Sequence, residues 1–147
     1  MKKLLIPPVF VLLSLILIVG FYFFIPKFNI ISFPFNLSGL AITMVGFAFT
    51  GKSHEALTKH KTTLFIEKSS NMVTQGIYSK TRNPMYVGMF LLLLGIAICF
   101  GNLFSLITPL GFLLIIQFSF IPKEEKLMFD VFGQEYLDYK AKVRMWI

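Results

Sequence analysis

Three long stretches without a charged residue dominate this sequence of 147 residues. No Asp, Glu, Lys or Arg occurs in the 23 residues between Lys3 and Lys27, the 24 between Lys27 and Lys52, or the 40 between Arg82 and Lys123. A helix needs about 20 apolar residues to cross ~30 Å of hydrocarbon. The first two stretches are therefore each long enough for one crossing, and the third is long enough for two.

A natural turn pair, Gly101-Asn102, lies near the middle of the third stretch. We therefore predict an all-α integral membrane fold with four spans, in which the second span continues as a helix past the membrane. The predicted spans cover residues 4–25, 37–51, 85–100 and 103–121. Only 14% of the residues are charged, against about 25% in soluble domains, and the length predicts a single domain, residues 1–147.

Lys and Arg are distributed unequally around the predicted spans. Only Lys27 lies between the first two spans and none lies between the last two, whereas the other basic residues and all seven acidic ones fall on the opposite side. The positive-inside rule then places both termini and the middle segment in the cytoplasm, most simply at a bacterial inner membrane. The net charge of +7 reflects this topology and attraction to anionic headgroups, so we expect no nucleic-acid partner.

The sequence pattern of the tail after the fourth span predicts a helix at about residues 123–142 that lies on the membrane surface. Gly133 predicts a break in this helix. Its apolar residues recur every three or four positions: Met128, Phe132, Tyr136, Tyr139 and Val143. Two adjacent carboxylates, Glu124 and Glu125, precede this face, and such a pair is costly at an interface unless a cation balances it. Either Lys123 and Lys126 balance them or a cationic ligand does.

The third span begins with a sequence that is typical of a capped helix. Asn83 is a good N-cap residue and Pro84 a good first helical residue. The free backbone N–H groups and the positive end of the helix dipole then face the cytoplasm, which predicts an anion site. Tyr78 and Tyr86 flank this start, although interfacial tyrosines are also common as plain membrane anchors.

Together these pieces resemble the membrane methyltransferases that include isoprenylcysteine carboxyl methyltransferases and phospholipid N-methyltransferases. The resemblance covers residues 61–147. It rests on an ordered set of short motifs: Met72-Val73-Thr74-Gln75-Gly76-Ile77-Tyr78, Arg82-Asn83-Pro84-Met85-Tyr86-Val87-Gly88, Glu124-Glu125 with Leu127, Phe132-Gly133, Glu135-Tyr136 and Tyr139.

The resemblance implies S-adenosylmethionine as the methyl donor, bound at the cytoplasmic ends of the last two spans under the middle loop and the tail. The cofactor-binding residues that it implies are Met72, Val73, Tyr78, Asn83, Pro84, Met85, Tyr86, Glu124 and Glu125. Among them, Glu124 would meet the ammonium group of the cofactor and Glu125 would support that site. The resemblance assigns no catalytic residue.

The implied activity is methyl transfer to a lipophilic or membrane-partitioned acceptor: an isoprenylcysteine-like carboxylate, a phospholipid amine or a small thiol. Phe120 stands where prenylcysteine-directed members carry an Arg for the substrate carboxylate, which weakens the first of these. A non-enzymatic membrane scaffold or subunit and a reductase-like relative are the alternatives. We expect no metal site, because His54 and His60 are six residues apart and do not share a helical face.

Overall fold

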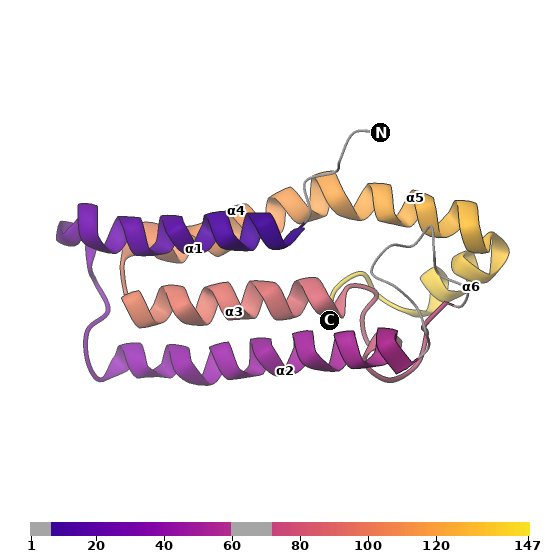
Figure 1. Ribbon diagram of the computed structural model, residues 1–147, viewed down its shortest axis with the longest axis horizontal. Helices are drawn as coiled ribbons and strands as arrows, with labels where there is room; N and C mark the ends of the chain where they lie inside the picture. Colours follow the sequence, from indigo (N-terminus) through magenta and orange to yellow (C-terminus); the bar gives the residue numbers. More distant parts are fainter. Residues whose placement is uncertain (1–6, 60–71) are drawn as a thin grey trace.

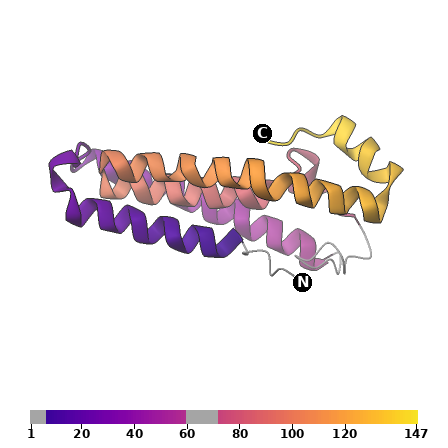
Figure 2. The ribbon, with the colours of Figure 1, turned by 90° about the horizontal axis from the view of Figure 1, so that it is seen from above.

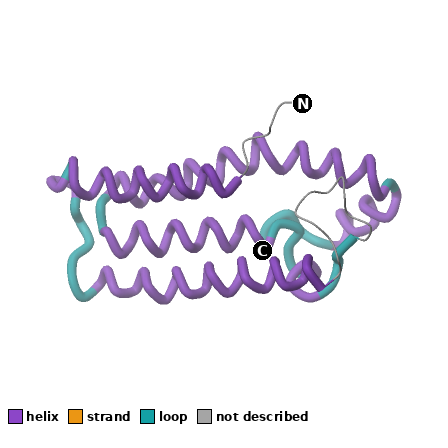
Figure 3. Tube along the Cα trace, in the orientation of Figure 1, coloured by secondary structure: helices purple, strands orange, loops and turns teal. Residues whose placement is uncertain are grey.

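The computed structural model describes residues 7–59 and 72–147, and these form helices and loops (Figure 3). The helices are α1 (Pro7–Phe24), α2 (Ser38–Lys59), α3 (Pro84–Phe100), α4 (Leu103–Ile115), α5 (Ile121–Phe132) and α6 (Gln134–Lys142). An isolated bridge joins Asn29 to Asn102. The predicted all-α class is confirmed for this part of the chain, whereas residues 4–6 of the first predicted span and His60 lie outside it.

The helix bounds agree closely with the charge-free stretches. Within residues 7–59 and 72–147, two helices are long and apolar enough to cross a membrane. They are Pro7–Phe24 and Leu103–Phe132, a continuous helix of 30 residues that comprises α4, α5 and the turn between them. α3 is apolar but shorter, with 17 residues. α2 continues beyond the predicted span to Lys59, as expected.

The tail differs from the single helix predicted at residues 123–142. α5 follows α4 directly through one π-helical turn, Ile116–Phe120, and the helix continues past Pro122. The helix ends at Gly133, which has a positive φ of 53°, and α6 then folds back toward the bundle (Figure 1). The break predicted near Gly133 is confirmed, but the tail consists of two helices.

The bundle is an up-and-down arrangement with α3 at its centre. α3 packs against α1, α2 and α4, and α1 also packs against α4. Figures 1 and 2 show the elongated result: the start of α3, the end of α2, α5 and α6 gather at one end, and the α1–α2 and α3–α4 connections lie at the other. Residues far apart in the sequence are thereby brought together at the first of these ends.

Small residues line the contact between α2 and α3. Gly46 on α2 faces the backbone of Gly88 and Leu92 on α3 so closely that a β-carbon would overlap both. Gly39 and Gly95 make an equivalent contact one heptad further along, where the Thr43 side chain also packs. Small residues at helix interfaces are typical of membrane bundles, because packing rather than the hydrophobic effect must hold lipid-embedded helices together.

Asn102 fixes the opposite end of the bundle. Its side chain is fully buried, and its Nδ2 donates to the backbone oxygen of Ile25 at 2.9 Å and to Asn29 Oδ1 at 2.7 Å. Its Oδ1 accepts from the N–H of Phe104 at 3.0 Å and so caps α4. One amide thus satisfies the end of α1 and the start of α4, which holds these two helices side by side.

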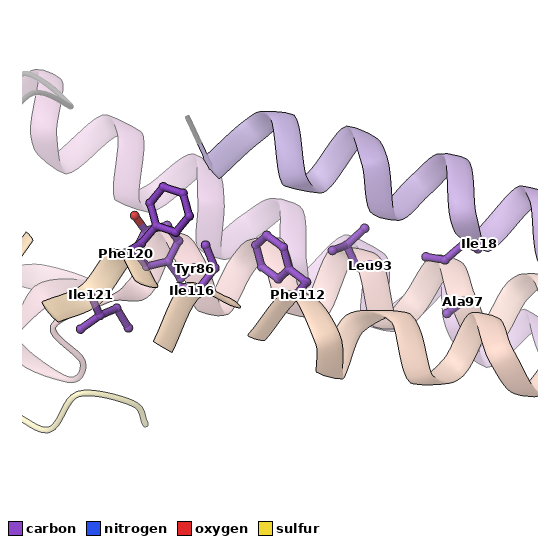
Figure 4. Packing of buried hydrophobic residues seen from close by; sticks show 8 residues of the cluster. All are labelled: Ile18, Tyr86, Leu93, Ala97, Phe112, Ile116, Phe120 and Ile121. Atoms are coloured by element: carbon purple, nitrogen blue, oxygen red, sulfur yellow. The ribbon is translucent and has the colours of Figure 1, made fainter. Parts of the chain in front are cut away.

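The buried core runs along α3 toward the end that carries the site. Figure 4 shows this cluster extending from Ala97 and Ile18 past Leu93 and Phe112. At its far end Tyr86 lies beside Phe120, within a group that includes Ile116 and Ile121 (Figure 4). The core therefore ends directly at the start of α3.

The α2–α3 contact predicts opposite effects for two glycines of α2. Gly46→Ala should lower the free energy of unfolding by ~1–3 kcal/mol, because the methyl group overlaps backbone atoms that cannot move aside. Gly51→Ala should leave it unchanged or raise it by up to ~1 kcal/mol, because nothing lies within 4 Å of its β-carbon and alanine favours the helix. Thermal unfolding in one detergent tests both, and equal effects would contradict the packing.

Candidate cofactor site

The start of α3 is anchored by the C-terminal segment of the chain. Asn83 occupies the N-cap position, but its side chain does not cap the helix. Its Nδ2 instead donates to the backbone oxygen of Met145 at 3.2 Å. The predicted side-chain cap is therefore wrong, because a carbonyl from the far end of the chain competes for the amide. Pro84 is the first helical residue, as predicted.

Two further hydrogen bonds hold the same segment. The Arg82 N–H donates to the backbone oxygen of Arg144 at 2.9 Å, and the buried Thr81 Oγ1 donates to that of Met145, also at 2.9 Å. Trp146 Nε1 donates to Gln117 Oε1 in the π-helical turn at 3.3 Å. The last residues of the chain therefore join the start of α3 to the α4–α5 junction.

Tyr86 and Glu124 meet across the gap between α3 and α5. The Tyr86 hydroxyl donates to Glu124 Oε1 at 2.5 Å, although the two residues are 38 positions apart in sequence. Tyr86 is 7% exposed. The expectation that the two motifs come together at one end of the bundle is confirmed.

Glu124 is a half-buried residue, and the hydrogen-bond partner of its carboxyl group in the described part of the chain is the neutral phenol of Tyr86. Burial raises the pKa of Glu124 above its ordinary value of 4.5, and the hydrogen bond from Tyr86 opposes this only in part. No ion pair with Glu124 occurs among residues 7–59 and 72–147. Removal of a carboxylate from water without a cation is costly, so this group is suited to a cationic ligand.

Glu125, by contrast, is already neutralised. Its Oε1 lies 3.1 Å from Nη1 of Arg82, and its Oε2 lies 2.6 Å from Nζ of Lys140. The sequence leaves two partners open for the acidic pair, the neighbours Lys123 and Lys126 or a cationic ligand. The described residues give Glu125 other partners, because the fold brings Arg82 and the α6 helix to it.

Tyr78 lies in the short 3₁₀ turn Gly76–Ser79, which Gly76 opens with a φ of 64°. Burial raises the pKa of the Tyr78 hydroxyl, and nearby Tyr139 and Glu124 raise it further. The Tyr139 hydroxyl donates to the backbone oxygen of Tyr78 at 2.7 Å. α6 therefore holds this turn close to the Tyr86–Glu124 pair.

No side-chain hydrogen bond links the other expected site residues, Met72, Val73 and Met85, to Tyr86 or Glu124 in the described part of the chain. Val73 is buried, and Met72 and Met85 are half-buried. Two surface cavities, of about 550 and 480 Å³, lie along α1 and beside the α1–α2 connection, and none of the nine expected site residues lines either of them. Within residues 7–59 and 72–147, His, Cys, Asp and Glu form no group that could hold a metal ion.

Several contacts of this site were not anticipated from the sequence. They involve Thr81, Gln117, Met145 and Trp146, together with the ion pairs of Arg82 and Lys140. The one available signal was Trp146, the only tryptophan of the chain, whose indole N–H needs a partner when the ring is buried.

The fold and the site define a helical protein with a buried, unbalanced carboxyl at one end of an apolar bundle. Comparison with known proteins then identifies the class: the chain belongs to the phospholipid methyltransferase family, whose model matches residues 34–135. Family membership and the two long apolar helices of the described residues together indicate an integral membrane protein.

Curated relatives include protein-S-isoprenylcysteine O-methyltransferases of two yeasts. The Schizosaccharomyces pombe protein is 37% identical over 79 residues, which cover 52% of this chain and 32% of the relative. The Saccharomyces cerevisiae protein is 33% identical over 81 residues, or 55% and 34% of the two chains. An uncharacterized Haemophilus influenzae protein is 36% identical over 63 residues, its whole length. The matches to the two yeast enzymes span about a third of their length.

The raised pKa of Glu124 predicts a pH-dependent cost in the free protein. A carboxyl whose pKa is higher in the folded state makes the free energy of unfolding fall as pH rises from 4.5 through the folded pKa. Glu124→Gln should remove this fall and leave the protein at least as stable at pH 7, since an amide oxygen still accepts from Tyr86. Thermal unfolding between pH 4 and 8 tests this, with the exposed Glu135→Gln as control; a parallel loss of stability at every pH would contradict it.

Proposed function

We propose that this chain transfers a methyl group from S-adenosylmethionine to a lipophilic or membrane-partitioned acceptor. The observation that carries the proposal is the buried carboxyl of Glu124, held by Tyr86 and unpaired with any cation in the described part of the chain. S-adenosylmethionine carries an ammonium and a sulfonium, which this carboxyl would neutralise. Family membership supports the same reading.

The nine expected residues have different parts in this proposal. Glu124 binds the ammonium, and Tyr78 and Tyr86 offer ring faces to the cationic ligand, which contributes ~0.5–2 kcal/mol. Asn83, Pro84 and Met85 form the start of α3, which binds the carboxylate at the positive end of the helix dipole through free backbone N–H groups such as that of Met85. Pro84 has no N–H, and that of Asn83 donates to Thr81 Oγ1. Met72 and Val73 contact the adenosine part with their backbone. Glu125 belongs to the site through its ion pairs.

The cofactor supplies an activated methyl group, so the protein needs no covalent catalyst. Its task is to align an acceptor behind the methyl carbon and to exclude water, and such positioning lowers a barrier by up to ~7–11 kcal/mol. The aromatic residues around the site suit this task. An amine or thiol acceptor must also lose a proton, whereas an anionic acceptor need not.

The acceptor side of the site is apolar. Phe120 is 5% exposed and packs edge-on against Phe10 of α1, with ring centroids 5.4 Å apart. Arg82 is occupied by Glu125. A free carboxylate on the acceptor therefore finds no guanidinium among these residues, and a phospholipid amine or a small thiol fits better than an isoprenylcysteine-like carboxylate.

We further propose that residues 1–147 act as one domain with four spans. The four predicted spans, residues 4–25, 37–51, 85–100 and 103–121, would cross the membrane, so that Glu124, the rest of the site and both termini would lie at the cytoplasmic face of a bacterial inner membrane. Large apolar side chains on α1, α2 and the π-helical turn after α4 face outward, including Ile16, Met44 and Phe118 with exposed fractions of 59%, 72% and 71%. Such surfaces require lipid around them, and an acceptor with a hydrocarbon part then reaches the site from within the bilayer.

Binding of labelled S-adenosylmethionine to the purified protein in detergent tests the proposal. Glu124→Gln should weaken binding about tenfold or more, because it removes a charge-assisted contact at nearly constant volume. Glu135→Gln, the same change at an exposed site of the tail, should bind as the wild type does. Equal affinity in the Glu124 variant would refute the assigned role.

The alternatives give different results in the same preparation. A scaffold or subunit would not bind the cofactor, and a reductase-like relative would show nicotinamide-dependent turnover instead. Incubation of membranes with cofactor labelled in the methyl group then identifies the acceptor, according to whether the label appears in lipid, in protein or in a volatile product.

A further inference from the structure

We propose that Arg82 and Glu125 are a positioning pair, which holds α5 against the start of α3 so that Glu124 meets Tyr86, and that Glu125 does not itself contact the cofactor. This inference rests on the proposed function, and it divides the two adjacent carboxylates into a ligand and a support. The first observation is geometric. Arg82 lies one helical turn before Tyr86, and Glu125 directly follows Glu124, so the two contacts join the same two segments in parallel.

The second observation is that each carboxylate oxygen of Glu125 lies beside a cation. Its side chain is 19% exposed and that of Arg82 is 9% exposed, while Lys140 is 43% exposed. The atoms Arg82 Nη1 and Glu125 Oε1 are 3.1 Å apart but are not aligned as a hydrogen bond. The contact is therefore Coulombic, and two cations, Arg82 and Lys140, already balance the single charge of Glu125.

The surroundings of this pair keep it in place. Tyr136 of α6 is buried beside it, and the pKa of the Tyr136 hydroxyl is raised to about 12, mainly by burial and then by Glu125, with Arg82 acting in the opposite direction. The backbone of Arg82 is also bound to that of Arg144. The main chain of Arg82 therefore stays at the start of α3 when its partner is lost.

The loss of one partner should consequently move α5 rather than Arg82. Removal of one member of a buried ion pair leaves an uncompensated charge, whereas replacement of both members by neutral groups is often nearly neutral. Because Glu124 is the next residue on α5, a displacement of about 1 Å would break its 2.5 Å contact with Tyr86 and disturb any ligand bound there. This predicts that the two single variants are worse than the double variant.

The experiment measures S-adenosylmethionine affinity by calorimetry for the full chain in lipid nanodiscs. Glu125→Gln and Arg82→Met should each weaken binding about tenfold, and the double variant should return to within about threefold of the wild type. Lys142→Met is the matched control, since Lys142 is an exposed residue of α6 that pairs with no acidic residue among the described ones, and it should change binding by less than about threefold. If Glu125 contacts the cofactor, the double variant will bind no better than Glu125→Gln alone, and the proposal is overturned.

A second cycle tests whether the pair acts through Glu124. In a Glu124→Gln background, Glu125→Gln should cause little further loss of affinity, because the charged contact between Glu124 and the ammonium of the cofactor is already gone. A merely structural role would instead give losses that add. Additive losses therefore also overturn the proposal.

Thermal unfolding of the same variants separates this inference from the proposed function. If the wild type binds no S-adenosylmethionine, the proposed function fails, and the pair is then judged by its melting temperatures alone. The double variant should melt above both single variants, and Glu124→Gln should be coupled to Glu125→Gln. Independent, additive shifts would refute the positioning pair whether or not the cofactor binds.

Discussion

The cost of burying one carboxyl group organises the functional end of this molecule. Glu124 is removed from water, accepts a hydrogen bond from Tyr86 and has its pKa raised by burial. The contacts of Glu124 with other residues do not offset the free-energy cost of removing its carboxyl group from water. The packing of the surrounding structure must therefore keep it in place. The holding elements come from four separate parts of the chain: the start of α3, α5, α6 and the terminal residues.

The residues around Glu124 are locally less favourable for stability than the rest of the fold, as is usual for binding sites. The apolar core, the glycine contacts of α2 with α3 and the Asn102 network are locally well satisfied. The opposite end carries an unbalanced acid, a helix start without its side-chain cap and a π-helical turn. Unfavourable features thus gather at one end of an otherwise regular bundle, which is where a ligand would compensate them.

Much of this layout could be predicted from the sequence, because simple patterns determine where the helices lie and which of their ends come together. Charge-free stretches define the helices, and an even number of antiparallel helices must bring Tyr86 and Glu124 to the same end. Gly133 has its own local signal, since glycine favours a break, and the break is present. The four-span topology and the roles of the nine expected residues remain proposals.

The hydrogen-bond and ion-pair partners in the site could not be predicted from the sequence, because residues distant in the chain compete with neighbouring ones for the same side chains. A local pattern assigns Asn83 to capping, but Met145 arrives from 62 residues away and takes its amide. Lys123 and Lys126 are the nearest cations to Glu125 in sequence, yet the fold supplies Arg82 and Lys140. The terminal segment is extended and short, so it has no periodicity from which its contacts with Thr81 or Gln117 could be inferred.

The π-helical turn at Ile116–Phe120 determines the sign of the charge that faces Tyr86. Such a turn accommodates one residue more than an α-helix does, and each residue turns the helix by about 100°. If the extra residue were absorbed into regular α-helix while α4 stayed in place, every later side chain would advance by one position. Lys123 would then occupy the place of Glu124, and a cation would stand where the bundle now offers an acid.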